Sequence, residues 1–272
     1  MTTLTSKIKP SLHCCAFFVL FAFYFIITEL PITNIDPWKK YGYVQSIVLY
    51  ILSCISLLSV PQMLLNAMGL LYFNQFPDKE TLNGPPLLAP FLCFRVVTRG
   101  SYPDLVKYNV KRNFKKCEAL GLVNFSFEVV TDNFIGILEK NKIREIIVPN
   151  KYQTLTGVLY KARALQYALE DKVNVLQNDD WIVHLDEETV LTKSSIIGIV
   201  NFVLNGKHQI GQGAISYVDE EIVNVLTTLL DSFRFTDDLG SLQFQLRVLH
   251  KPIFPIKGSF LVVQNKVCDL QW

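Results

Sequence analysis

The stretch WIVHLDEET, residues 181–189, carries the pattern that decides both the fold and the candidate site. Its first five residues are mostly apolar, and they predict a buried β-strand at 181–185. Three carboxylates follow at once, and such a cluster of like charges is costly unless a cation or solvent relieves it. On an extended chain Asp186 and Glu188 face the same way, while Glu187 points away. The spacing predicts a Mg²⁺ or Mn²⁺ site at Asp186 and Glu188; the alternative is an acidic helix start.

On both sides of this stretch, short apolar runs alternate with amphipathic helical patterns. This alternation predicts an α/β fold, in which a mostly parallel sheet is covered by helices on both faces. Ser101 is the expected cap of the first helix, and Gly121 and Gly206 are expected to end two helices. Strands are predicted at 91–97, 125–131, 143–148, 181–185 and 212–218. Helices are predicted at 101–120, 157–170, 194–204 and 220–235.

Polar residues follow several of the predicted strands. In open parallel sheets, ligands bind beyond the carboxyl ends of the strands. The candidate site residues therefore lie at 98–100, at Asp132 and at 186–188. The pair Asp237-Asp238 precedes Leu-Gly and is expected in a turn or at a helix end rather than in the site.

The N-terminal part of the chain is strongly apolar. No Asp, Glu, Lys, Arg or His occurs between Tyr41 and Pro77. Two transmembrane helices are predicted, at about 12–30 and 44–72, with a kink near Pro61. The alternatives are a cleaved signal peptide for the first run and a buried core helix for the second. The expected domains are a membrane region at 1–77 and an α/β domain at 78–272.

Composition excludes some partners and says little about others. The net charge is only +2, and no Lys/Arg stripe interleaves with aromatic residues, so no nucleic-acid partner is expected. The six cysteines contain no C-x-x-C pair, which is typical of reduced cysteines in a domain that faces the cytosol.

Four stretches together resemble a known family: FRVVTRG at 94–100, VLYKARALQY at 158–167, VHLDEET at 183–189 and NFVLNGKH at 201–208. They are similar to egghead-type β-1,4-mannosyltransferases, which are inverting glycosyltransferases of family 2. The similarity extends from about residue 40 to about residue 264.

The resemblance implies a GT-A-like fold, a GDP-mannose donor, a glucosylceramide or related glycolipid acceptor, and a Mn²⁺ or Mg²⁺ cofactor. It also implies glycosphingolipid biosynthesis at an endoplasmic reticulum or Golgi membrane, with the catalytic domain on the cytosolic side. The residues that it assigns to nucleotide-sugar binding are Thr98, Arg99, Asp132, Lys161, Arg163 and Asp186. Those that it assigns to the metal are Asp186 and Glu188.

The family's acidic catalytic base and its Q-x-x-R-W motif have no counterpart in this sequence. We therefore expect a glycosyltransferase domain that is incomplete at its C-terminus, and we name no catalytic base. The alternatives are a non-catalytic membrane protein that binds a nucleotide-sugar and another family 2 transferase, such as a polysaccharide synthase.

Overall fold

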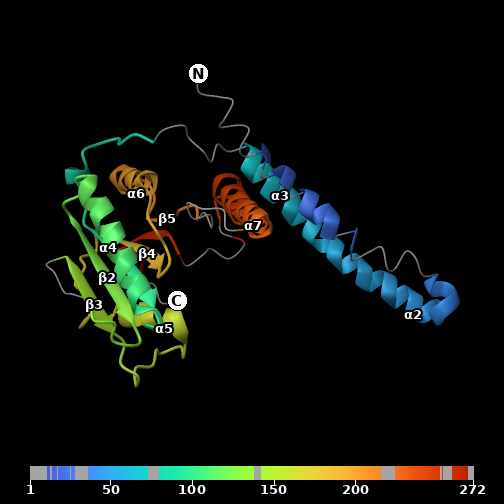
Figure 1. Cartoon of the computed structure of the whole chain (residues 1–272), viewed down its shortest axis with the longest axis horizontal. Coiled ribbons are helices and arrows are strands. Elements are labelled where there is room, and N and C mark those ends of the chain that lie inside the picture. Colours follow the sequence, from blue (N-terminus) through green and yellow to red (C-terminus); the bar gives the residue numbers. More distant parts are fainter. Residues whose placement is uncertain are drawn as a thin grey trace. The chain divides into compact units, whose positions relative to one another are not determined.

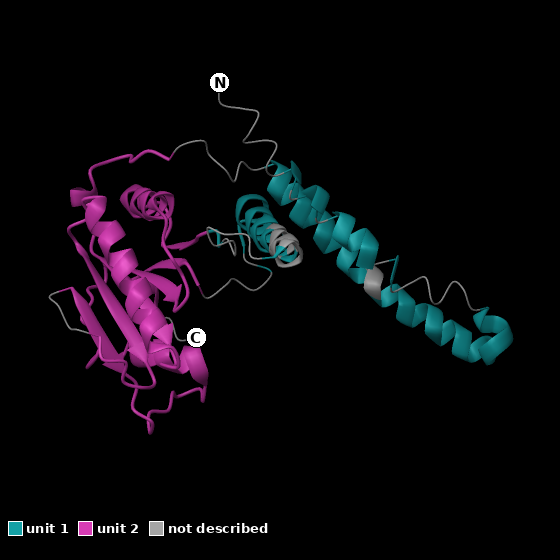
Figure 2. Ribbon diagram, viewed as in Figure 1, with its two compact units in different colours: residues 1–78, 214–256 teal, residues 79–213, 257–272 magenta. Residues whose placement is uncertain are grey.

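The structure is a computed structural model that divides the chain into two compact units (Figure 2). Unit 1 comprises Met1–Asp78 and Ala214–Ile256, and unit 2 comprises Lys79–Gly213 and Lys257–Trp272. This division does not test whether residues 1–77 form a membrane region, so the predicted domain boundary between residues 77 and 78 stays a prediction. The residues described are 11–12, 14–16, 18–24, 26–27, 36–72, 80–137, 142–215, 224–251, 253 and 259–268.

Unit 2 contains a mixed sheet in the order β3-β2-β1-β4-β6-β5 (Figure 1). The first four strands are parallel to one another, whereas β6 runs antiparallel to both β4 and β5. The predicted α/β class is confirmed, and the sheet fits a GT-A-like fold. The strands are β1 (Leu92–Thr98), β2 (Phe125–Thr131), β3 (Ile143–Ile147), β4 (Trp181–Asp186), β5 (Ile210–Gln212) and β6 (Leu261–Gln264).

Helices cover both faces of this sheet. On one face, Phe114 of α4 packs against Phe125 and Phe127 of β2, and Phe202 of α6 meets the Trp181 ring of β4 edge-on. On the other face, α5 buries Ala164 among apolar side chains of β1, β2 and β3. The helices of this unit are α4 (Pro103–Ala119), α5 (Tyr160–Tyr167), α6 (Lys193–Asn205) and the short η2 (Pro86–Leu88) and α8 (Asn265–Cys268).

Some helix ends differ from the prediction and others agree with it. The residue before α4 is Tyr102 rather than Ser101, and it makes no capping bond. Gly206 ends α6 in the left-handed conformation as predicted, and Thr192 begins it through a capping box with Ser195. Helix α5 is shorter at both ends than the predicted 157–170.

A row of polar side chains crosses the buried face of the sheet beneath α5. Cα register aligns Arg144, Glu128, Arg95 and His184 on the adjacent strands β3, β2, β1 and β4. Arg95 and Glu128 are fully buried, and the Arg95 Nε donates to Glu128 Oε2 at 2.8 Å. Arg144 pairs with the other Glu128 oxygen. The row therefore places a paired charge cluster inside an otherwise apolar core.

Two pKa shifts accompany this row. Burial alone would raise the pKa of Glu128, but Arg95 and Arg144 hold it below its usual value. Burial, together with the positive charges of Arg95 and Lys161, lowers the pKa of His184 to about 3. Glu128 is therefore charged and His184 neutral at physiological pH.

Unit 1 is helical over its described residues. A long segment consists of α2 (Pro37–Ser53), the 3₁₀ turn η1 (Cys54–Leu58) and α3 (Ser59–Tyr72). The interruption at η1 precedes Pro61, which lies in the first turn of α3, where its missing N–H breaks no helical bond. The unit also contains α7 (Val225–Phe244) and the π-helical η3 (Gln245–Leu249).

Helices α3 and α7 approach closely within unit 1. A Cβ atom added at Gly69 would lie 2.2 Å from the carbonyl oxygen of Gly240, so both positions need glycine. Asn66 of α3 donates to Asp237 Oδ1 at 2.5 Å. The prediction that Asp237-Asp238 lies in a turn or at a helix end is wrong, because the backbone is helical through α7.

The two predicted membrane spans are not borne out by the described helices, none of which combines the length and the apolar character that a bilayer crossing needs. Residues 13, 17, 25 and 28–30 of the first span lie outside the described residues, and the second span is divided by η1. Nor does the predicted strand 212–218 form as expected: β5 ends at Gln212, and 216–218 lie outside the described residues.

Candidate active site

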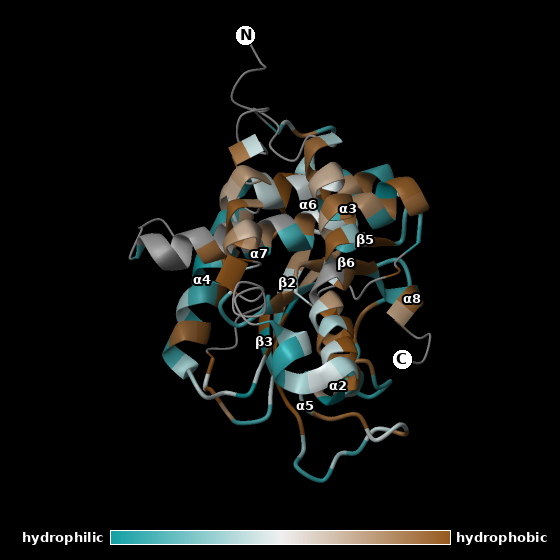
Figure 3. Cartoon of the chain, turned by 90° about the vertical axis from the view of Figure 1, so that its right-hand side faces the viewer, coloured by the Kyte–Doolittle hydropathy of each residue, from teal (hydrophilic) through white to brown (hydrophobic). Residues whose placement is uncertain are grey.

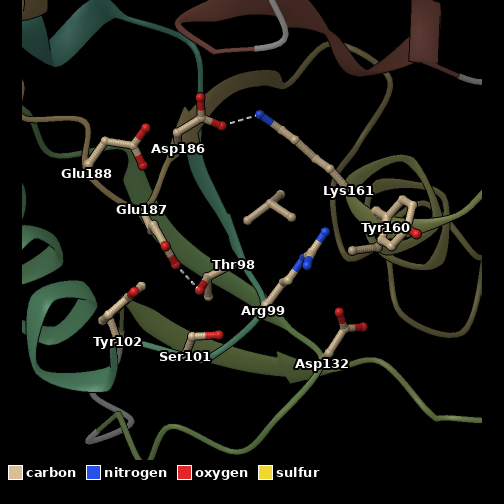
Figure 4. A pocket seen from close by; sticks show the side chains of 12 residues that line it. Thr98, Arg99, Ser101, Tyr102, Asp132, Tyr160, Lys161, Asp186, Glu187 and Glu188 are labelled. Atoms are coloured by element: carbon tan, nitrogen blue, oxygen red, sulfur yellow. Dashed lines mark hydrogen bonds and ion pairs between the residues drawn. The ribbon is translucent and has the colours of Figure 1, made fainter. Parts of the chain in front are cut away.

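The carboxyl ends of β2, β1 and β4, which are neighbours in the sheet, meet at one pocket (Figure 4). Thr98 is the last residue of β1, Asp186 is the last residue of β4, and Asp132 follows the end of β2. The pocket has a volume of about 400 Å³, which is within the range of small-molecule sites. Its lining residues are Val97, Thr98, Arg99, Ser101, Tyr102, Asp132, Tyr160, Lys161, Ala164, Asp186, Glu187 and Glu188.

Asp186 is fixed by its backbone at the edge of the sheet. Its N–H donates to Thr189 Oγ1 at 3.3 Å and to Ser259 Oγ at 3.2 Å. The N–H of Thr189 returns to the Asp186 carbonyl at 3.0 Å, which closes a turn. The strand therefore ends at Asp186, and the extended geometry assumed for residues 186–188 does not form.

This turn changes the expected direction of Glu187. Glu187 was predicted to point away from the site, but it lines the pocket and accepts a hydrogen bond from Thr98 Oγ1 (Figure 4). The Thr98 hydroxyl also accepts the N–H of Gly100 at 2.9 Å. Thr98 thus joins the β1 and β4 ends, because one hydroxyl bonds both the acidic turn and its own following loop.

Two buried asparagines of α4 hold the acidic turn from behind. Asn109 Nδ2 donates to the Glu187 carbonyl at 2.9 Å, and Asn113 Nδ2 donates to the Thr189 carbonyl at 2.9 Å. Asn113 Oδ1 also accepts the N–H of Leu191 at 2.8 Å. The two residues are four apart and share one helix face, so they fix the loop after β4 along much of its length.

Helix α5 contributes two cations, and the structure places them differently. Lys161 lines the pocket and forms an ion pair with Asp186 Oδ1. Arg163 is not among the lining residues; its Nη2 pairs with Asp132, and its Nη1 donates to the carbonyls of Pro149 and Tyr152 at 3.2 Å each. Arg163 therefore holds the Asp132 carboxylate rather than facing the pocket itself.

Arg99 and Tyr160 form a wall of the pocket. The Arg99 guanidinium lies 4.8 Å from the centre of the Tyr160 ring, within cation–π range. Tyr160 has a φ of +55°, which is uncommon for a bulky residue. Gly100 has a φ of +78°, and a Cβ there would lie 3.0 Å from the Asn133 carbonyl oxygen. The β1 loop therefore packs tightly onto the β2 loop beside this wall.

The pocket is acidic overall. Four acidic and two basic side chains line it, which leaves a net charge of −2. Oxygen donors of this kind suit Mg²⁺ and Mn²⁺, so the donor chemistry of Asp186 and Glu188 fits a divalent cation. Among the residues described, however, no three His, Cys, Asp or Glu side chains form a ready metal cluster. A cation at Asp186 and Glu188 would need further oxygen ligands from a bound molecule or from water.

Sequence reasoning missed several residues of the site. Tyr160 and Tyr102 lie close in the sequence to the predicted site residues, but no sequence pattern marks their rings as pocket walls. The signal for Asn109 and Asn113 was present, because two amides four residues apart interrupt the apolar face of a helix. The residues missed are Ser101, Tyr102, Asn109, Asn113, Tyr160 and Ser259.

The sequence of this chain is similar to known glycosyltransferases. Residues 181–270 match the model of the family described as Glycosyl transferase family group 2. The chain is 52% identical over 267 residues to "Beta-1,4-mannosyltransferase egh" of Drosophila melanogaster, which covers 96% of this chain and 58% of that protein. It is 50% identical over 264 residues to "Beta-1,4-mannosyltransferase bre-3" of Caenorhabditis elegans and of Caenorhabditis briggsae. Each of these two matches covers 95% of this chain and 58% of the relative.

The chain thus spans 58% of the length of these curated relatives. No solved structure shows significant similarity to it. The resemblance predicted from four sequence stretches is confirmed: the chain is a homologue of proteins named β-1,4-mannosyltransferase, and its residues 181–270 match a model of glycosyl transferase family group 2.

Proposed function

We propose that this chain provides the donor-binding part of a β-1,4-mannosyltransferase that uses GDP-mannose. The acceptor in this proposal is glucosylceramide or a related glycolipid, and transfer inverts the configuration of the sugar. The observation that carries the proposal is the pocket at the β1, β2 and β4 ends, where acidic and basic side chains converge in a homologue of named mannosyltransferases.

The pocket residues divide into two groups in this proposal. Asp132 accepts hydrogen bonds from the guanine base, whose N–H groups are donors, and Arg163 holds its carboxylate in place. Tyr160 and Arg99 offer a flat, cationic surface beside it. The diphosphate would be placed at the other end of the pocket, next to Lys161, Asp186 and Glu188. The described residues are assigned to donor binding, and none of them is assigned as catalytic base.

A divalent cation is part of the proposal for an electrostatic reason. The lining residues carry a net charge of −2, and a nucleotide diphosphate is also negative, so the two repel each other. Asp186 and Glu188 would hold Mn²⁺ or Mg²⁺, which neutralises the leaving diphosphate when it is bound. Thr98 and Asn109 keep the acidic turn in position for this task.

We also propose that unit 1 associates with an endoplasmic reticulum or Golgi membrane and leaves the pocket on the cytosolic side. Support comes from the uncharged helical segment 41–72, whose apolar side chains are largely exposed. Tyr43 and Tyr72 are about 80% exposed at its two ends. Aromatic residues at these places are typical of membrane interfaces.

A donor-binding and transfer assay tests the proposal. The purified chain in nanodiscs is incubated with radiolabelled GDP-mannose, glucosylceramide and Mn²⁺, and both bound donor and glycolipid product are measured. We expect GDP-mannose to bind and UDP-glucose not to compete. Competition by UDP-glucose but not by GDP would refute the donor assignment. Donor binding without any product would favour the nucleotide-sugar-binding alternative.

Matched variants connect the assay to the pocket. We expect Asp186→Asn to lower Mn²⁺-dependent donor binding by about 100-fold, because a charged metal ligand is lost. Asp171→Asn carries the same change at an exposed position outside the pocket and should bind donor as the unchanged protein does. Equal affinity of both variants for the donor in the presence of Mn²⁺ would show that Asp186 does not contribute to donor binding.

A further inference from the structure

The ion pair between Lys161 and Asp186 lies at the position where a cation is proposed to bind (Figure 4). The Lys161 ammonium contacts Asp186 Oδ1, and both side chains line the pocket. An ammonium and a divalent cation cannot occupy one side of the same oxygen at the same time. A metal ion that binds Asp186 at this oxygen would therefore have to displace the Lys161 ammonium.

The surroundings of Asp186 allow its carboxylate to change partner. Its backbone is held by Thr189 and Ser259, so the strand end stays in place when the side chain exchanges contacts. The side chains of Asp186 and Lys161 are each 35% exposed, and ion pairs with that access to water contribute little stability. Lys161 also has a flexible four-carbon stem that can move its charge within the pocket.

The second ion pair from α5 provides a contrast in the same pocket. The Arg163 side chain is only 15% exposed, and it donates to two backbone carbonyls in addition to Asp132. The Arg163 end of this pair is held by several acceptors, because the planar guanidinium donates to more than one oxygen at once. The two pairs lie two residues apart on α5, and the Arg163 pair is the less exposed to water.

We infer that Lys161 is an exchangeable counter-ion that occupies Asp186 until a divalent cation and a nucleotide diphosphate enter together. This inference rests on the proposed function. In the empty pocket, Lys161 neutralises Asp186 and weakens metal binding. When metal and diphosphate bind, the cation takes Asp186 and the ammonium moves to a phosphate oxygen, for which it is a suitable partner. Metal and donor binding are thereby coupled through one side chain.

The test measures Mn²⁺ binding directly, by the loss of the free-ion EPR signal, in the full chain with and without GDP. We expect Lys161→Met to bind Mn²⁺ roughly five- to tenfold more tightly without GDP, because the competing charge is gone. The same variant should bind GDP more weakly in the presence of Mn²⁺. Lys161→Arg keeps the charge and should leave Mn²⁺ binding weak without GDP.

Lys107→Met is the matched control, since Lys107 is exposed on α4 outside the pocket and the variant changes the net charge equally. Its Mn²⁺ affinity should equal that of the unchanged protein. If Lys161→Met binds Mn²⁺ without GDP no more tightly than Lys107→Met, the exchange is refuted while the proposed function stands. If GDP never promotes Mn²⁺ binding in the unchanged protein, the proposed metal site and this inference both fail.

Discussion

The two units use a similar supply of apolar residues in opposite ways. In unit 2, strands β1, β2 and β4 are buried almost throughout, because helices cover both faces of the sheet. In unit 1, the segment from α2 to α3 exposes many large apolar side chains, and brown residues recur along both helices in Figure 3. Apolar character alone therefore does not define a core; it needs a second surface to pack against.

The two units also differ in their charged residues. Unit 2 keeps Arg95 and Glu128 inside its core, where each compensates the other. The segment 41–72 of unit 1 has no charged side chain to compensate. The following changes test the packed core of unit 2 and the exposed surface of unit 1.

The largest expected effect comes from breaking the buried pair. Glu128→Ala leaves Arg95 charged and unpaired in the core, and we expect unit 2 to lose about 3–5 kcal/mol of unfolding free energy. Urea denaturation followed by the fluorescence of buried Trp181 measures this, with Trp38 and Trp272 replaced by Phe. Glu118→Ala removes an exposed carboxylate from α4 as the control. Equal midpoints for the two variants would contradict the role of the pair.

Acid should destabilise unit 2 through His184 before it protonates the carboxylates. His184 is neutral in the fold with a pKa of about 3, but it binds a proton in the unfolded chain near its ordinary value of 6.5. Unfolding therefore takes up a proton, and stability falls as pH is lowered through this window. Between pH 6.5 and 4.5 we expect a loss of about 2 kcal/mol.

The same Trp181 fluorescence measures this slope. His184→Leu should flatten it, because no proton is then taken up at that position. His208→Gln, an exposed histidine in the same unit, should retain the slope of the unchanged protein. A steep slope in His184→Leu would assign the acid sensitivity to another group.

A smaller effect is expected at the start of α6. Thr192 Oγ1 accepts the N–H of Ser195 at 3.0 Å, and Thr192→Ala removes that bond from an exposed helix end. We expect a loss of about 1 kcal/mol in unit 2. Thr192→Ser keeps the hydroxyl and should lose much less in the same denaturation experiment.

The smallest effect on unit 2 should follow a charge placed on the exposed surface of unit 1. Leu58 is 76% exposed in η1, so Leu58→Asp should leave the Trp181 unfolding midpoint unchanged. Retention on membranes after carbonate extraction should fall, since an aspartate in the apolar part of a bilayer costs about 2.5–3.5 kcal/mol. The matched change Val183→Asp in β4 should instead unfold unit 2. Loss of the Trp181 transition in Leu58→Asp would show that the two units are not independent.

The sequence predicted unit 2 much better than unit 1, for a physical reason. Strands β2 and β4 were placed within one residue, because buried parallel strands leave uninterrupted apolar runs between polar ends. In unit 1 a long apolar run predicts a helix, but it does not predict the position at which the helix is interrupted. Residues 237–238 lie inside α7, where Asp237 accepts a hydrogen bond from Asn66 of α3, and no local sequence pattern marks that contact.

The candidate site was located from the strand ends, but its side-chain directions were not. Parallel register brings Thr98, Asp132 and Asp186 to one edge, and any such sheet would do the same. The direction of Glu187 depends on the Thr189 turn, and the placement of Arg163 depends on the Pro149 and Tyr152 carbonyls. Hydrogen bonds of this kind join distant segments and leave no periodic signal in the sequence.

The row formed by Arg144, Glu128, Arg95 and His184 also favours one register of strand pairing. A slip of one residue in any of the four strands turns its polar side chain to the opposite face, among phenylalanine rings. A slip at Arg144, Glu128 or Arg95 would then separate that charge from its partner inside the core. The native register therefore brings the carboxyl ends of β1, β2 and β4 together at the pocket.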